Sequence, residues 1–429
     1  MNEQRGVSFK ERIPIFIDKE QKQDGTFYCY DGHNYGYISE SQLKEFKQFK
    51  TDYLPIFRDK KNDTIVNESY DKSDKKSRKH KLKTLKRLHT EFIRDAQILQ
   101  KETNGLINLF KTGSNVKTAV ELAFHFLNEK EISAEDITLL ESEWIENASC
   151  GAFIFADKYE GEAFKYDLNS AYPSIYSNVH LLLPVKQGEF KKLTKDEFLK
   201  KGFVSYGIYR CTIEYNNDDK NNHKIFKLND KNYYTNIDIN YAVKLGFKIT
   251  LIEDEDFNFL SYDRSRTKTG SECFSEFVKL LYPLRKNVIV KDRVKSLLRC
   301  LWGALSQRNI FKKKYKMDVE SELFDDCDIV EIVPFNNDSY QITYMKRDKP
   351  YETNYARMKP FLLSKGRVKI SEYIAPYKQH IKRCHTDSMT STIELKHIEH
   401  SLELGKMKLE KSGYCVITNS MNEEWKGEK

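Results

Sequence analysis

Residues 166–175 read YDLNSAYPSI, and this stretch determines how the rest of the chain is interpreted. An apolar run ends in one carboxylate, Asp167, and then turns through small residues toward an aromatic side chain and a proline. Carboxylate oxygens are the ligands that hard divalent cations prefer, and the N–H groups of Ser170 and Ala171 are accessible to phosphate oxygens. The pattern predicts a strand and a turn that hold a metal ion and a triphosphate, with Tyr172 as a wall against a sugar.

The same stretch resembles motif A (DxxSLYPSI) of the family B DNA polymerases. The matching positions are Asp167, Ser170, Tyr172 and the Pro-Ser-Ile that follows, while Ala171 stands where leucine is usual. The resemblance implies that Asp167 and the carbonyl group of Leu168 bind metal. It also implies that the amides of Ser170 and Ala171 contact the nucleotide and that Tyr172 excludes a ribose 2′-hydroxyl.

Residues 295–303 read KSLLRCLWG and have apolar side chains at helical spacing. This segment resembles motif B (KxxxNSxYG) of the same family, with Lys295 and Gly303 in the matching positions. Arginine, cysteine and tryptophan replace the usual asparagine, serine and tyrosine at Arg299, Cys300 and Trp302. These three substitutions surround the expected place of the nascent base pair. They therefore leave open whether fidelity and discrimination of the sugar are those of the family.

Lys295 and Arg299 are four residues apart and therefore share one face of the expected helix. Cations on two adjacent helices can clamp a triphosphate and neutralise the charge that develops on it. The resemblance implies that Lys295 binds the triphosphate with Arg285 as the second cation, while Lys286 competes for that role. Arg299 and Trp302 are accessory candidates. Considered alone, the segment is equally compatible with a solvated basic helix face.

Residues 383–389 read RCHTDSM and resemble motif C (YxDTDS), a hairpin turn that carries two carboxylates. Asp387 matches the second carboxylate, whereas His385 stands where the first belongs; Thr386 lies between them. Two-metal catalysis needs carboxylates that bridge metals about 3.5–4 Å apart, and Asp167 and Asp387 supply that pair. The resemblance implies two divalent ions, magnesium or manganese, and the softer imidazole of His385 would favour manganese.

The chain has 429 residues with 32% charged and 39% hydrophobic residues, which is typical of a globular protein with two or three subdomains. A formal net charge of +8 permits nucleic-acid binding without requiring it. The eight cysteines are scattered and form no CxxC pair, so a reducing compartment is expected and no zinc site is indicated.

No apolar run approaches the length of a membrane span, and the polar N-terminus argues against a secretion signal. We therefore expect no membrane partner. The expected location is the cytoplasm or the replication compartment of a virus, plasmid or organelle.

The fold class expected is α+β: the right-hand polymerase fold, with an antiparallel palm sheet backed by helices and helical fingers inserted. The resemblance points to the protein-primed and mobile-element branch of the family. The N-terminal part is expected to be a truncated or vestigial exonuclease-like region, residues 1–105. It is followed by a palm segment with motif A (106–180), a protein-primed type of palm insertion (181–270) and fingers with motif B (271–312). A palm segment with motif C (313–418) and a tail without a thumb (419–429) complete the expected parts. Within them, residues 403–418 are expected to form a short strand pair, and Asp95 lies where the third exonuclease motif could fall.

The function expected from this resemblance is a template-directed DNA polymerase that adds dNMP to a 3′-hydroxyl by two-metal catalysis. Its partners would be primer-template DNA, dNTPs, and a terminal protein or a chain that supplies a thumb. The alternative is a catalytically degenerate polymerase fold that serves as a DNA-binding or scaffold protein, which would explain His385 and the altered motif B. A nuclease built on N-terminal carboxylates is a third interpretation.

Overall fold

The computed structural model describes residues 12–21, 26–48, 53–57, 74–198, 204–215, 219–316, 324–336, 339–396 and 398–426. The chain divides into two compact units: Met1–His125 with Lys279–Leu301, and Phe126–Val278 with Trp302–Lys429. All three boundaries between the units fall inside helices: α4 (Asn115–Glu129), α8 (Gly270–Leu284) and α9 (Lys291–Leu305). Among the described residues, no helix has the length and apolar character that a membrane span needs.

The first unit contains a four-stranded sheet in the order β3-β2-β1-β4. Its strands are β1 (Ile13–Gln21), β2 (Thr26–Tyr30), β3 (Tyr35–Ser39) and β4 (Tyr53–Phe57), with α1 (Glu40–Gln48) between the last two in the chain. β1 pairs antiparallel with β2 and parallel with β4. Alternate apolar residues of β1, Ile15 and Ile17, form a small core with Ile38 and Leu43, as expected for a strand with period two.

Helices complete the first unit: α2 (Asp74–Glu102), α3 (Leu109–Thr112), the start of α4 (Asn115–Glu129) and the first part of α9. The ring of Phe92 on α2 packs on Phe16 of β1, with 5.7 Å between centroids. Asp95, the candidate exonuclease carboxylate, accepts hydrogen bonds from Arg94 at 2.8 Å and from Arg293 at 3.0 Å. Asp95 therefore ties α2 to α9.

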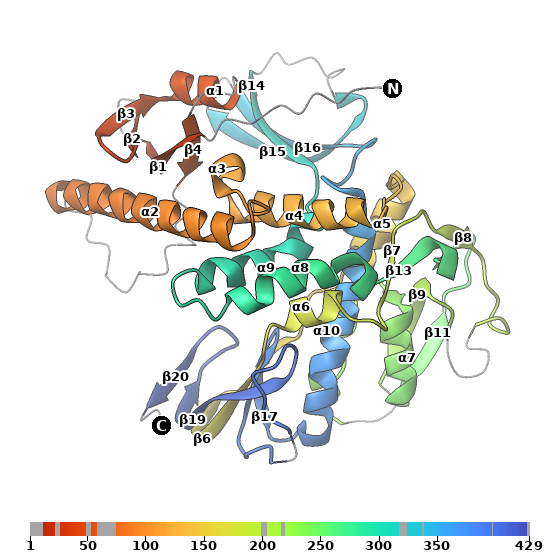
Figure 1. Ribbon diagram of the computed structural model, residues 1–429. Coiled ribbons are helices and arrows are strands. Elements are labelled where there is room, and N and C mark those ends of the chain that lie inside the picture. Colours follow the sequence, from red (N-terminus) through yellow and green to blue (C-terminus); the bar gives the residue numbers. More distant parts are fainter. Residues whose placement is uncertain are drawn as a thin grey trace. The chain divides into compact units, whose positions relative to one another are not determined.

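The second unit is built on a six-stranded sheet, here called the main sheet, in the order β20-β19-β6-β18-β17-β5. Figure 1 labels four of its strands, β20, β19, β6 and β17. Every neighbouring pair in it is antiparallel. The strands are β5 (Ile154–Ala156), β6 (Tyr159–Leu168), β17 (Ile381–His385), β18 (Ser388–Ser391), β19 (Met407–Ile417) and β20 (Glu423–Lys426).

One face of the main sheet packs on α10 (Lys359–Ile374). Successive residues of a strand point to opposite faces, and in β6 Tyr166 and Leu168 are buried in a core that includes Ile370 and Ile374 of α10. Cys384 of β17 is fully buried in the same core. Asp167, between the two buried residues of β6, therefore faces the opposite side of the sheet.

A second sheet in this unit has the order β10-β9-β12-β8, and β11 also pairs with β9. It comprises β8 (Glu189–Lys191), β9 (Gly207–Glu214), β10 (Tyr233–Thr235), β11 (Lys248–Leu251) and β12 (Phe259–Ser261), while β7 (Leu182–Pro184) and β13 (Thr267–Thr269) form a separate ribbon. The helix α7 (Asn236–Lys244) joins this sheet to α10, where Tyr241 hydrogen-bonds Ser371 at 2.7 Å.

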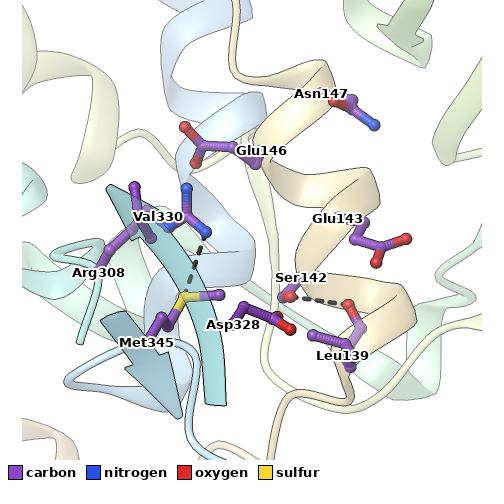
Figure 2. Close-up of a pocket in the computed structure, with 9 residues that line it drawn as sticks. All are labelled: Leu139, Ser142, Glu143, Glu146, Asn147, Arg308, Asp328, Val330 and Met345. Carbon is purple, nitrogen blue, oxygen red and sulfur yellow. Dashed lines mark hydrogen bonds between the residues drawn. The ribbon is translucent and has the colours of Figure 1, made fainter. Parts of the chain in front are cut away.

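Three further strands form a separate sheet in the order β14-β16-β15: β14 (Ile310–Lys316), β15 (Cys327–Asn336) and β16 (Ser339–Lys346). A cavity of about 300 Å³ is lined by residues of α5 (Leu139–Ala148) and of this sheet (Figure 2). Glu143 and Glu146 line one side, and Asp328 and Met345 line the other, with Arg308 hydrogen-bonded to the Met345 sulfur at 3.2 Å. None of the predicted site residues lines this cavity.

Two local expectations for the C-terminal part are wrong. Residues 403–418 were expected as a short strand pair, but 407–417 form one continuous strand, β19, which pairs with β6 along its length. The apparent break is Gly413, whose φ of +144° is accommodated within the strand. The segment 419–429, expected as a tail, contains β20, which pairs with β19. In addition, β14–β16 form a sheet of their own within a stretch expected to contain the palm.

A buried ion pair supports the second unit. The guanidinium of Arg357 is fully buried and donates to Glu141 through Nε at 3.1 Å and Nη2 at 2.9 Å. Glu141 also accepts a hydrogen bond of 2.8 Å from Tyr262. Removing one partner of such a pair leaves an uncompensated buried charge, which is strongly destabilising.

We expect Arg357→Leu to lower the free energy of unfolding by about 3–5 kcal/mol, because Glu141 loses its counter-charge. The measurement is urea unfolding followed by circular dichroism. The matched control is Lys244→Ala, which removes an exposed 3.2 Å pair with Glu372 and should cost about 0–1 kcal/mol. Equal effects of the two substitutions would contradict the importance assigned to the buried pair.

Candidate active site

The segment after Asp167 is held in a tight turn. Ser170 has a φ of +52°, in the left-handed region, and α6 (Ala171–Tyr176) begins at the next residue. The Asn169 amide donates to the Lys406 carbonyl at 2.9 Å, and the Gly405 amide donates back to the Asn169 carbonyl at 2.7 Å. The motif A turn is therefore pinned to the residues that lead into β19.

Thr386 and Asp387 form the turn of the β17–β18 hairpin, here called the motif C turn. Thr386 has a φ of +61°, and its amide donates to the Phe153 carbonyl at 2.8 Å. Its hydroxyl donates to Asp387 Oδ1 at 2.6 Å. The backbone and one carboxylate oxygen of this turn are thus held by hydrogen bonds.

Strand pairing brings the two predicted carboxylates together. β18 pairs with β6 so that Ser388 lies opposite Asp167, and the Leu168 amide donates to the Asp387 carbonyl at 2.9 Å. Burial is the largest influence on Asp167 and raises its pKa, and the negative charge of Asp387 raises that pKa further. The two side chains therefore interact electrostatically at one end of β6.

A lysine also approaches this pair. β19 pairs with β6 so that Lys408 lies opposite Asp167, and the Lys408 ammonium is 3.2 Å from Asp167 Oδ2. Its positive charge lowers the pKa of Asp167, against the effects of burial and Asp387. The sequence motifs did not identify this contact, because it depends on the register of two strands that are far apart in the chain.

The donors present suit a hard divalent cation. The carboxylates of Asp167 and Asp387 and the carbonyl of Leu168 are oxygen donors of the kind that Mg²⁺ and Mn²⁺ accept. Within the described ranges, no group of three or more His, Cys, Asp or Glu side chains is placed to hold a metal ion. An ion here would take its remaining ligands from backbone, phosphate and water oxygens, as Mg²⁺ commonly does.

The predicted wall against the sugar, Tyr172, is stacked on Trp302. Their ring centroids are 4.7 Å apart and the planes differ by 17°. Burial raises the pKa of Tyr172 to about 12, with Arg367 lowering it and Asp387 raising it. The hydroxyl therefore stays protonated at neutral pH. The structure brings together two residues that the sequence placed in separate motifs.

The predicted cations belong to the first unit. Lys295 and Arg299 are both exposed on α9, in agreement with the shared helix face inferred from their spacing. Arg285 follows α8, and its guanidinium lies 5.3 Å from the ring centroid of Tyr282. The binding of a triphosphate by these residues stays a prediction.

His385 has a hydrogen-bond partner of its own. Its Nδ1 lies 3.0 Å from the carbonyl oxygen of Ser420, in the connection between β19 and β20. Arg383, two residues earlier on β17, donates to the same oxygen at 3.1 Å. Sequence reasoning did not find this contact, because residues 419–429, which include Ser420, were expected to form a tail.

The curled antiparallel main sheet, the helices that cover it and the smaller sheets define the fold of a DNA polymerase. The chain is similar to Phi29 DNA polymerase complexed with primer-template DNA and incoming nucleotide, with a TM-score of 0.55, 14% identity, and coverage of 94% of this chain and 74% of the other. It is similar also to Phi29 DNA polymerase complexed with single-stranded DNA, with a TM-score of 0.54, 16% identity, and coverage of 94% and 72%. The predicted fold class is confirmed.

Sequence comparison gives a different relative. No protein-family model matches the chain. A probable tRNA pseudouridine synthase D 1 of Methanococcus maripaludis is 24% identical over 295 residues, which cover 60% of this chain and 71% of the relative.

We expect Lys408→Met to strengthen the binding of Mn²⁺ by about fivefold, because one positive charge beside Asp167 is removed. The measurement is the Mn²⁺ dissociation constant by isothermal titration calorimetry. Lys406→Met is the matched control, since Lys406 pairs with Glu399 at 3.5 Å. Unchanged or weaker Mn²⁺ binding by Lys408→Met would show that the lysine does not compete with the metal.

Proposed function

We propose that this chain is a template-directed DNA polymerase that adds a deoxynucleoside monophosphate to the 3′-hydroxyl of a primer by two-metal catalysis. The observation that carries the proposal is the position of Asp167 and Asp387. They come from distant chain segments: Asp167 lies at the end of β6, and Asp387 lies in the turn that leads into the neighbouring strand β18. The two carboxylates influence each other electrostatically. The fold, which is that of DNA polymerases, supports the same assignment.

In this proposal Asp167, Asp387 and the Leu168 carbonyl hold two divalent ions, magnesium or manganese. The ions supply activation of the primer hydroxyl and neutralisation of the leaving pyrophosphate. The primer oxygen forms a bond to the α-phosphorus, the bond from that phosphorus to the β-phosphate bridge breaks, and the hydroxyl proton passes to solvent. The Thr386 hydroxyl orients Asp387 through its 2.6 Å hydrogen bond to Oδ1.

The motif resemblance assigns the residues that would hold the nucleotide. Tyr172, fixed by its stack on Trp302, would meet the sugar and exclude a 2′-hydroxyl. Lys295 and Arg285, or Lys286 in place of the latter, would bind the triphosphate. The Ser170 and Ala171 amides would contact its oxygens, and Arg299 would border the base pair.

The partners belong to the same proposal. The similar structures are of a polymerase complexed with primer-template DNA, single-stranded DNA and incoming nucleotide, and we propose primer-template DNA and dNTPs for this chain. A protein-primed relationship, a terminal protein, and a viral, plasmid or organellar setting are parts of the proposal that follow from the motifs.

The second candidate is a catalytically degenerate scaffold. Two observations favour it: Lys408 contacts Asp167 where a metal is expected, and His385 replaces a carboxylate. Pseudouridine formation is suggested by the archaeal relative alone. An assay of tRNA for pseudouridine, run beside the polymerase assay, separates this activity from the others.

Primer extension on a short primer-template with dNTPs and Mg²⁺ or Mn²⁺ tests the function. We expect extension by the wild-type chain and a loss of roughly 10²-fold or more in Asp167→Asn and Asp387→Asn, because each loses a charged ligand at constant shape. Fluorescence anisotropy should show primer-template binding within about threefold of wild type, since neither carboxylate attracts DNA. Binding of the primer-template by the wild-type chain without any primer extension would favour the scaffold interpretation.

Sugar selection tests the role of Tyr172. We expect Tyr172→Ala to raise incorporation of ribonucleotides relative to deoxyribonucleotides by about 10- to 100-fold, because the ring is replaced by open space. Tyr172→Phe keeps the ring and its stack on Trp302, so it should retain the wild-type preference. The measurement is kcat/KM for matched dNTP and rNTP pairs. An unaltered preference in Tyr172→Ala would exclude the gate role.

A further inference from the structure

His385 and Arg383 lie on the same face of β17 because they are two residues apart. Both are within hydrogen-bond distance of one acceptor, the Ser420 carbonyl oxygen, at 3.0 Å from His385 Nδ1 and 3.1 Å from Arg383 Nε. A carbonyl oxygen can only accept, so the hydrogen bond requires the proton of the imidazole to be on Nδ1. The side chain at position 385 therefore acts as a hydrogen-bond donor.

The acceptor belongs to an ordered connection, residues 418–422, here called the C-terminal turn. The side chain of Asn419 accepts from the amides of Met421 at 2.8 Å and Asn422 at 2.9 Å. The Thr418 amide donates to the Asn422 carbonyl at 3.3 Å. The Ser420 carbonyl is thus presented by a turn that has its own hydrogen bonds.

Glu423 attaches the same turn to the main sheet. Its carboxylate lies 2.6 Å from Lys165 of β6 and 3.2 Å from Arg383 of β17, and it accepts a 3.2 Å hydrogen bond from Thr390 of β18. Burial alone would raise the pKa of Glu423, but the hydrogen bond and charge of Lys165 and the charge of Arg383 outweigh it and lower that pKa. The C-terminal turn is therefore bound to three strands that flank or carry the motif C turn.

Position 385 is also coupled directly to Asp387. The carbonyl of His385 accepts from the Asp387 amide at 2.9 Å and from the Ser388 hydroxyl at 3.3 Å. Thr386 between them is in the left-handed region, where a non-glycine residue persists only if its surroundings enforce it. A displacement of residue 385 is therefore passed to Asp387.

We propose that His385 is a positioning residue: it fastens the motif C turn to the C-terminal turn through Ser420 and thereby fixes Asp387. This inference rests on the proposed polymerase function. It assigns the histidine at the first position of the motif a donor role in place of a metal-ligand role. An aspartate there would point an acceptor at the Ser420 carbonyl and repel it.

The matched variants are His385→Asn and His385→Asp. Asparagine Nδ2 is separated from Cβ by the same number of bonds as histidine Nδ1, so it can donate to Ser420, and aspartate has the same shape without a donor. Ser420→Ala keeps the carbonyl and serves as the control for the turn. Should His385→Asp fail to fold by circular dichroism, His385→Ala, which removes the donor without adding a charge, makes the same comparison.

Two readouts are measured for each variant: kcat and KM of primer extension with Mg²⁺ and Mn²⁺, and hydrogen exchange of peptides that contain residues 381–391 and 418–426. We expect His385→Asn and Ser420→Ala to stay within about threefold of wild type. We expect His385→Asp to lose about 10- to 100-fold in kcat with a smaller change in KM. Exchange in both peptides should be faster in His385→Asp only, and exchange of peptides from the rest of the chain should be unchanged in every variant.

A higher Mg²⁺-dependent rate in His385→Asp would overturn the inference and restore the metal-ligand role. Equal exchange in the asparagine and aspartate variants would also overturn it. If the wild-type chain extends no primer, the proposed function fails and hydrogen exchange alone decides: faster exchange of both peptides in His385→Asp but not in His385→Asn supports the coupling, and equal exchange rejects it.

Discussion

The structure depends on a sheet that keeps two like charges side by side. Asp167 and Asp387 repel each other, and burial makes the ionised form of Asp167 less favourable still. The opposing forces are strand pairing between β18 and β6, a core of apolar residues shared with α10, and the ammonium of Lys408. The main sheet therefore maintains a charge arrangement that isolated segments would not adopt.

The same sheet also organises the residues around that pair. β6 carries Asp167 at one end, and β19 pairs antiparallel with β6 along the whole length of β6. β19 therefore places Lys408 beside Asp167 at its start and leads into the C-terminal turn at its end. Because the sheet is curved, this turn lies next to β17, where His385 and Arg383 hydrogen-bond to the Ser420 carbonyl. Segments distant in the chain thus share one mechanical support.

The sequence predicted the fold class and the residues at the carboxylate pair, because motifs A and C are local patterns whose turns are encoded by adjacent residues. The contact of Lys408 with Asp167 and the contacts of the Ser420 carbonyl with β17 could not be predicted, since they depend on long-range strand register and sheet curvature. The strand 407–417 was misread as two because Gly413 interrupts the apolar pattern without interrupting the pairing. The roles of Lys295 and Arg285 follow from the motif and the spacing, and they await measurement.

The shared acceptor at Ser420 has an evolutionary consequence. A carbonyl oxygen held by two donors on β17 makes position 385 and the C-terminal turn dependent on each other. In the role proposed for His385, a carboxylate at this position would weaken the attachment of the turn unless the turn changed as well, and loss of the turn would leave the histidine without its partner. Such mutual dependence is epistasis that entrenches both features, so a lineage carrying them would retain or lose them together.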